Sequence, residues 1–237
     1  MSGALATRLA ELDWAAIERE LDAQGCARLP GVLSQELCRE LSALYLQDAH
    51  FRSRVVMAKH GFGRGEYRYF AYPLPPPVAE ARSLMYARLA PVANRWNALL
   101  GLETRYPVAH ETYLAECHRA GQRRPTPLLL RYETGDYNCL HQDLYGERVF
   151  PLQVAFLLSA PEQDFTGGEF VLTEQRPRMQ SRAEVVPLQQ GDAVVFAVHH
   201  RPVAGAKGCY RVNLRHGVSR IRAGQRHTLG IIFHDAL

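Results

Sequence analysis

The feature that most limits the possible folds of this 237-residue chain is a change in hydrophobic period near Pro125. Before this point, Trp14, Ile17 and Leu21 recur at helical spacing. After it, short apolar or alternating runs are separated by turn sequences such as Thr134-Gly135-Asp136. Such a series of short strands is typical of an antiparallel sandwich or barrel. The sequence therefore predicts a mainly β fold with N-terminal helices.

We expect the strands at residues 128–132, 152–158, 169–172, 193–198, 211–222 and 226–233. In the N-terminal part we expect a short strand within residues 25–32, a helix that starts at the N-cap candidate Ser34, and a helix over residues 78–100. We place the division at residue 125. Residues 1–124 would form a helical region whose loop, residues 51–77, packs on a core made by residues 125–237, all in one compact domain.

A potential metal site begins at His141-Gln142-Asp143, where an imidazole and a carboxylate lie two residues apart. On an extended strand both side chains point to one side and Gln142 points away. A histidine from a distant strand would complete a two-histidine, one-carboxylate triad, which suits Fe(II) and leaves positions open for a co-substrate and O2. The candidates for this third ligand are His199, His200, His216, His227 and His234.

Arg226 favours His216 among these histidines. A 2-oxoglutarate molecule that chelates iron through its oxo-acid end needs a cation for its far carboxylate, and a bidentate arginine suits that group. If residues 211–222 and 226–233 form a hairpin around a three-residue loop, His216, Arg226 and Thr228 face the same side. A two-residue loop would put His216 and Arg226 on opposite faces. Arg226 would then be one more surface residue of an arginine-rich hairpin.

The order of these motifs resembles that of the Fe(II)/2-oxoglutarate-dependent dioxygenase superfamily, especially its prolyl-hydroxylase-like branch. The ordered set is Tyr132, His141-Gln142-Asp143, Gly167-Gly168, His216 and Arg226. The resemblance covers about residues 125–234. It implies a double-stranded β-helix, the jelly-roll core, with the helices packed outside.

The same resemblance implies the cofactors and the roles of individual residues. Fe(II) would be held by His141, Asp143 and His216, with 2-oxoglutarate and O2 as co-substrates. The far carboxylate of 2-oxoglutarate would be bound by Arg226, helped by Thr228 and Tyr132, although Tyr132 could also simply fill the core. Thr228 stands where many relatives have serine, and the adjacent pair His199-His200 is unusual, so its role stays open.

Almost the whole chain also resembles a smaller prokaryotic family described as oxygenases acting on damaged nucleic acid. The matching stretches are residues 62–67 (FGRGEY), 125–130 (PTPLLL), 135–138 (GDYN) and 174–178 (EQRPR). This resemblance implies oxidative dealkylation of damaged DNA or RNA bases, with single-stranded or damaged nucleic acid as partner.

A basic and aromatic segment, residues 51–72, fits such a partner. Its net charge of +4 equals that of the whole chain, and it holds six aromatic side chains. Cations for phosphates and rings for stacking are what binding an unpaired base requires. The candidate substrate residues in it are Arg52, Arg54, Arg64, Tyr67, Arg68 and Tyr69. An alternative is an arginine-rich lid whose aromatic side chains belong to the core.

Composition limits the cellular location and the kinds of cysteine site that are possible, but it does not indicate the substrate. Five cysteines without a C-x-x-C pair argue against a disulfide framework and against a four-thiolate zinc site. The first eight residues lack the pattern of a secretory signal, and no apolar run has the length of a membrane span, so we expect a cytoplasmic protein that does not enter membranes. The oligomeric state is not predicted.

Two other functions compete with base dealkylation. The first is protein side-chain hydroxylation of the prolyl type, which the motif spacing favours and which would add one oxygen without releasing formaldehyde. The second is a barrel without catalytic activity that uses the motif region only for ligand binding.

Overall fold

The computed structural model describes residues 2–206 and 208–237. The N-terminal part contains α1 (Ser2–Glu11), α2 (Trp14–Gln24) and α3 (Gln35–Ala43), with three short 3₁₀ turns, Leu44–Leu46, Asp48–His50 and Met57–Lys59. The Asp13 side chain accepts a hydrogen bond from the backbone N–H of Ala16 and so caps α2. The Ser34 hydroxyl accepts from the backbone N–H of Leu37, which confirms the predicted start of α3.

Two more helices precede the β core. The long helix α4 (Pro76–Leu99) starts with proline in its first turn and buries Met85, Leu89 and Trp96. The shorter α5 (His110–Arg119) follows. The sequence predicted α4 but neither α5 nor α1, because helices of ten residues cover fewer than three turns and carry a weak periodic signal.

The strands form two antiparallel sheets. The larger sheet has the order β1-β11-β7-β14-β5-β4-β2, with β8 paired to β14. Its strands are β1 (Cys26–Leu29), β2 (Phe51–Val56), β4 (Glu66–Phe70), β5 (Leu128–Glu133), β7 (Leu152–Leu157), β8 (Phe165–Gly167), β11 (Ala193–Ala197) and β14 (Ile221–Ile231).

The smaller sheet has the order β10-β9-β13-β6-β3, with β12 paired to β13. Its strands are β3 (Gly63–Arg64), β6 (Tyr137–His141), β9 (Phe170–Gln175), β10 (Arg182–Val186), β12 (His200–Gly205) and β13 (Gly208–Val218). This arrangement confirms the predicted class, a mainly β jelly roll with N-terminal helices.

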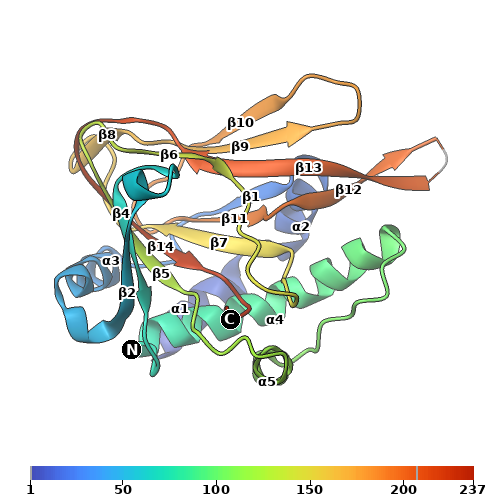
Figure 1. The fold of residues 1–237 in the computed structure, drawn as a ribbon, viewed down its shortest axis with the longest axis horizontal. Helices are drawn as coiled ribbons and strands as arrows, with labels where there is room; N and C mark the ends of the chain where they lie inside the picture. The colour runs from blue at the N-terminus through green and yellow to red at the C-terminus, as the bar shows by residue number, and fades with distance from the viewer. Residues whose placement is uncertain (1, 207) are drawn as a thin grey trace.

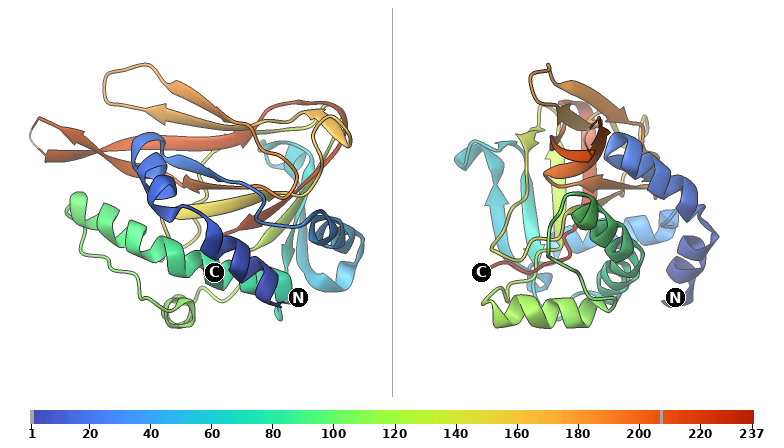
Figure 2. Two further views of the ribbon diagram at one scale, coloured as in Figure 1. Left: turned by 180° about the vertical axis from the view of Figure 1, so that it is seen from behind. Right: turned by 90° about the vertical axis from the view of Figure 1, so that its right-hand side faces the viewer.

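The two sheets pack face to face, and the long helix α4 lies on the outer side of the larger sheet (Figures 1 and 2). The core between the sheets contains Phe196, Leu172 and Leu214, all 3% exposed or less. Because strands alternate their side chains, each sheet also directs a row of residues into the space between the sheets. The functional residues belong to these inner rows.

The predicted hairpin of residues 211–222 and 226–233 is wrong. The chain leaves β13 after Val218 and enters β14 at Ile221, but β13 pairs with β6, β9 and β12 whereas β14 pairs with β5, β7 and β8. Gly224, expected in the turn, lies within β14, where a Cβ atom would come within 2.0 Å of the Asp164 carbonyl oxygen. The glycine is therefore explained by the close approach of β8.

Four strands that precede residue 125 take part in the two sheets, namely β1, β2 and β4 in the larger and β3 in the smaller one. Residues 51–70 form an irregular hairpin, in which β2 pairs with β4. The division at residue 125 thus describes a change of sequence pattern, and strands from both sides of it share the same sheets.

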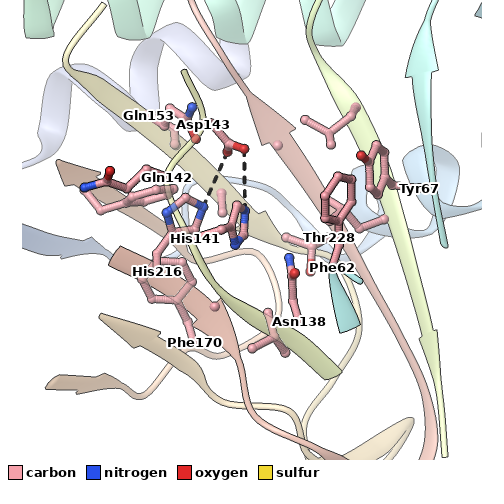
Figure 3. A pocket seen from close by; sticks show the side chains of 18 of the residues that line it. Phe62, Tyr67, Asn138, His141, Gln142, Asp143, Gln153, Phe170, His216 and Thr228 are labelled. Carbon is pink, nitrogen blue, oxygen red and sulfur yellow. Dashed lines mark ion pairs between the residues drawn. The ribbon is translucent and has the colours of Figure 1, made fainter. Parts of the chain in front are cut away.

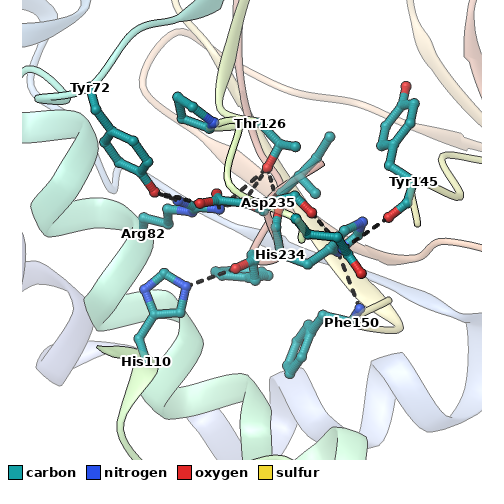
Figure 4. A network of polar contacts seen from close by, with 12 residues as sticks. Tyr72, Arg82, His110, Thr126, Tyr145, Phe150, His234 and Asp235 are labelled. Carbon is teal, nitrogen blue, oxygen red and sulfur yellow. Dashed lines mark hydrogen bonds and ion pairs between the residues drawn. The ribbon is translucent and has the colours of Figure 1, made fainter. Parts of the chain in front are cut away.

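The C-terminal residues that follow β14 are held by a buried polar network (Figure 4). Arg82 of α4 forms an ion pair with Asp235, with 2.8 Å between Nη2 and Oδ1, and its Nε donates to the carbonyl oxygen of Ile232. Tyr72 donates to the other oxygen of the same carboxylate. Since Arg82 and Asp235 are almost fully buried, this network fixes the end of β14 against the helices.

Within the described residues, no helix combines the length and the apolar composition that crossing a bilayer requires.

Candidate active site

His141, Asp143 and His216 converge between the two sheets (Figure 3). His141 ends β6 and lies directly opposite His216 of β13 in the strand pairing. Their Nε2 atoms are 3.5 and 3.4 Å from the two oxygens of Asp143, and the potential ligand atoms all lie within 4.8 Å of one another. Two imidazoles and a carboxylate at this spacing can hold one Fe(II) ion.

Hydrogen bonds prepare these side chains for metal binding. Nδ1 of His141 lies 2.8 Å from the carbonyl oxygen of Cys139, so it is the protonated nitrogen and Nε2 keeps its lone pair. Burial opposes ionisation of Asp143, but the neighbouring imidazoles of His141 and His216 hold the pKa of its carboxyl group well below the usual range. The site therefore offers an ionised carboxylate.

Tyr145 supports the same carboxylate, and sequence reasoning missed it. Its hydroxyl donates to Oδ1 of Asp143 at 2.9 Å, and Tyr69 in turn donates to the Tyr145 hydroxyl at 3.3 Å. The only available signal was its position two residues after Asp143.

Arg226 of β14 lies in the same space and is 2% exposed. Burial lowers the pKa of its guanidinium to about 10, which leaves it charged at neutral pH. Among residues 2–206 and 208–237, no carboxylate forms an ion pair with Arg226, and its Nε has no hydrogen-bond partner. A buried charge without a counter-ion costs several kcal/mol, so this arginine is suited to receive an anion.

The neighbours of Arg226 fit the same role. Thr228, two residues along β14, accepts a hydrogen bond from Nη1 of Arg226. Tyr132 pairs with Arg226 across β5 and β14, and its buried hydroxyl has no hydrogen-bond partner among the residues that the structure describes. Burial raises the pKa of Tyr132, so the phenol remains a donor. These three residues together can bind a carboxylate.

Arg226 and His216 therefore face the same space, as expected, but they do so from two sheets. The inner row of β14 holds Arg226, Thr228 and Gly230, and the inner row of β13 holds His216. Gly168 makes room for the arginine, since a Cβ atom there would lie 3.0 Å from Cδ of Arg226 and 2.2 Å from Cδ1 of Ile221.

These side chains line one cavity of about 240 Å³. Sequence reasoning did not identify several other residues of its wall: Phe62, Asn138, Leu144, Gln153, Phe170 and Phe196. Phe62 and Leu144 are 47% and 49% exposed, which places an apolar rim at the mouth of the cavity. Gln142 lines the cavity too, but its amide is directed to the backbone oxygen of Leu214.

The structure separates the six candidate substrate residues into two groups. In the first, each arginine has an internal partner: Arg52 donates to the carbonyl oxygen of Pro125, Arg54 pairs with Glu66, and Arg68 pairs with Asp48. Tyr69 is 9% exposed and is bonded to Tyr145.

The second group consists of Arg64 and Tyr67. Tyr67 lines the cavity. The Arg64 side chain is exposed and forms no ion pair with the described part of the chain. It follows Phe62 by two residues, so an exposed ring and an exposed cation lie close together beside the cavity mouth. Arg64 and Tyr67 remain candidates for contacting the substrate.

The other histidines considered as metal ligands lie elsewhere. The rings of His199 and His200 contact each other outside the cavity wall, with their centroids 4.2 Å apart and their planes tilted by 57°. His227 lines a separate depression with Arg39 and Asp164, and Nδ1 of His234 accepts from the backbone N–H of Phe150. His216 is thus the candidate that meets His141 and Asp143.

Solved structures of similar fold include a Pseudomonas putida prolyl-4-hydroxylase (TM-score 0.56, 15% identity, 94% of this chain and 99% of that one). An oxidoreductase of the 2OG-Fe(II) oxygenase family from Burkholderia pseudomallei matches at a TM-score of 0.54, with 18% identity over 95% of this chain and 94% of that one. A Trichoplax adhaerens prolyl hydroxylase, solved with a peptide of hypoxia inducible factor, matches at 0.55, with 14% identity over 92% and 87%. These likenesses establish the jelly-roll fold.

The protein is thus a jelly-roll oxygenase with a two-histidine, one-carboxylate cluster that can hold Fe(II). More closely, the chain belongs to the family of oxygenases described as catalysing oxidative methylation of damaged DNA, whose family model matches residues 65–236. Two uncharacterized proteins of Mycobacterium tuberculosis, from strains CDC 1551 and H37Rv, are 50% identical to it over 167 residues, which are 70% of this chain and 72% of each relative.

Proposed function

We propose that this oxygenase removes alkyl groups from damaged bases of DNA or RNA by hydroxylating the carbon next to nitrogen. The observation that carries the oxygenase site is a buried guanidinium that pairs with no carboxylate of the described residues, in the same cavity as a two-histidine, one-carboxylate cluster. The observation that favours a base as substrate is the match of the family model over most of the chain.

In this proposal each residue has a defined task. His141, Asp143 and His216 hold Fe(II), which together with 2-oxoglutarate and O2 supplies the oxidising power for a C–H bond. Arg226, Thr228 and Tyr132 bind the far carboxylate of 2-oxoglutarate. The unpaired donor atoms of Arg226 and Tyr132 and the ionised carboxylate of Asp143 fit these groups.

The product chemistry follows from the atom that is hydroxylated. A hydroxyl group placed on an N-methyl carbon gives a hemiaminal, which loses formaldehyde and leaves the nitrogen unsubstituted. Phe170 and Phe196 line the cavity against His216 and make this end of it apolar. Phe62 and Tyr67 offer aromatic faces to a base, and Arg64 offers a cation to its backbone phosphate.

The test is a turnover screen of the iron-loaded protein with 2-oxoglutarate against methylated oligonucleotides and peptide pools. We expect formaldehyde and succinate in equal amounts with a methylated oligonucleotide. A peptide that gains one oxygen without formaldehyde release would instead support a protein hydroxylase. Absence of 2-oxoglutarate turnover with every substrate would support a ligand-binding barrel without catalytic activity.

Binding of a single-stranded oligonucleotide tests the substrate surface directly. We expect Arg64→Ala to weaken binding. The slope of the logarithm of the binding constant against the logarithm of the salt concentration should become shallower by about one, because one phosphate contact is lost. Arg105→Ala is a matched control, since Arg105 is exposed and carries the same charge. It follows α4, which extends away from β2 and β4 towards its C-terminal end (Figure 1). Equal effects of the two variants would contradict a specific contact at Arg64.

A further inference from the structure

Gln153 is a buried polar residue of the cavity that the proposed function leaves without a task. It lies in β7 and is 3% exposed. Its amide nitrogen Nε2 has no hydrogen-bond partner within the described residues. An amide in such a position costs free energy unless a ligand satisfies it, so its presence points to a bound acceptor.

The place of Gln153 in the sheet indicates which acceptor this is. Ala155 of β7 pairs with Gly230 of β14, so Gln153 lies one inner position beyond Gly230. Arg226 lies two inner positions before Gly230, and its side chain bonds Thr228. Free donors therefore stand at the two ends of a row of inner-facing residues that runs along β14 from Arg226 and ends at Gln153 of the neighbouring strand β7.

The metal cluster lies at the Gln153 end of this row. Figure 3 shows Gln153 on the Asp143 side of the pocket, with Thr228 across from it. Gln153 makes no hydrogen bond to Asp143, whose oxygens instead face His141, His216 and Tyr145. The amide N–H is thus available to a ligand that reaches the metal cluster.

We propose that Gln153 is a positioning residue that donates from Nε2 to the near carboxylate of the 2-oxo acid, the end that reaches the metal, while Arg226 binds the far carboxylate. The inference rests on the proposed binding of 2-oxoglutarate in this cavity. A neutral donor suits this end, because the neighbouring Asp143 already supplies a negative charge and a second cation would compete with the metal for it.

The experiment is calorimetric titration of Mn(II)-loaded protein with 2-oxoglutarate and with pyruvate, which has the oxo-acid end but lacks the far carboxylate. We expect Gln153→Leu to weaken the binding of both acids by a similar factor, about 10- to 100-fold. Arg226→Gln should weaken 2-oxoglutarate and leave pyruvate unchanged. The isosteric Gln153→Glu, which keeps the side-chain volume, should weaken both acids further by repulsion.

The matched control is Gln190→Leu, since the Gln190 amide already bonds the carbonyl oxygen of Leu158 outside this cavity. Unchanged 2-oxoglutarate affinity in both Gln153 variants would overturn the inference. So would a loss of Mn(II) affinity with intact 2-oxoglutarate affinity, because Gln153 would then position Asp143. If the unsubstituted protein bound no 2-oxoglutarate, the failure would lie in the co-substrate assignment itself.

Discussion

At the residue scale, the metal cluster depends on side chains that do not touch the metal. Asp143 has two oxygens and three polar neighbours, of which His141 and His216 are potential ligands and Tyr145 is not. The Tyr145 hydroxyl fixes the carboxylate plane by its hydrogen bond to Oδ1. Such supporting hydrogen bonds commonly govern metal affinity.

We therefore expect Tyr145→Phe to weaken binding of Mn(II) or Fe(II) by about 10- to 100-fold while the fold is retained. Metal titration under anaerobic conditions measures this change. Tyr137→Phe is the control, because Tyr137 is 38% exposed and its hydroxyl makes no hydrogen bond in the described structure. An affinity within twofold of the unsubstituted protein would show that Asp143 needs no such support.

The sequence allowed the potential ligands to be recognised, since spacing in an extended strand and the order of motifs both pointed to His141, Asp143 and His216. It did not allow Tyr145 or Gln153 to be recognised. Their roles depend on which inner row they join and on what other side chains leave unpaired, and neither property is visible in a local pattern.

At the scale of elements, the prediction that His216 and Arg226 face the same space was correct, but the hairpin from which it was made does not exist. A hairpin register was used to place them on one side, whereas β13 and β14 belong to facing sheets. Both residues point into the interior because both strands bury their inner rows. Periodicity determines which residues are inside, but it does not determine which strands pair.

The close packing of β14 against Gly168 leads to a test of this element. Gly168 has a φ of +67°, and a Cβ atom there would displace Ile221 and Arg226. We expect Gly168→Ala to weaken 2-oxoglutarate affinity at least 10-fold. Gly135→Ala should carry a similar backbone cost, about 1 kcal/mol, without this loss, since no atom lies within 4 Å of its Cβ position.

Calorimetry for affinity and thermal unfolding for stability separate the two effects. If both variants lost stability equally and both retained 2-oxoglutarate affinity, Gly168 would serve only the turn before β9.

At the scale of the whole molecule, the fold class was predictable because the short-strand pattern that begins near residue 125 is long and consistent. The sequence did not allow helices α1 and α5 to be predicted. Nor did it predict that N-terminal strands pair into both sheets. Strand pairing across more than 50 residues, such as that of β4 with β5, is decided by tertiary packing that leaves no local pattern.

The attachment of the C-terminal residues to the helices makes stability depend on pH. His110 of α5 is 4% exposed and lies 2.8 Å from the carbonyl oxygen of Phe233 through Nε2. Burial lowers the pKa of His110 to about 4, below its value of 6.5 in an unfolded chain. The unfolded state therefore binds a proton more readily, and the folded state is favoured only while His110 is neutral.

We expect the free energy of unfolding to be highest above pH 6.5 and to fall as the pH decreases towards about 4, with His110 contributing about 3 kcal/mol. His110→Gln should flatten this dependence. Burial also lowers the pKa of His227 and His234 to about 4, so the difference between the two proteins isolates His110. Urea unfolding from pH 4 to 8 measures it, and parallel curves would contradict this origin.

The two halves of the active site lie on facing sheets, with the metal ligands on the smaller sheet or in the loop after β6, and the carboxylate-binding residues on the larger one. The spacing of the sheets is set by the packed core, which changes little because protein interiors are densely packed. Under the proposed function, this fixed spacing sets the length of the acid that can reach both the metal cluster and Arg226. We expect a diacid shortened by one methylene group to bind more weakly, because it would lose one of these two contacts.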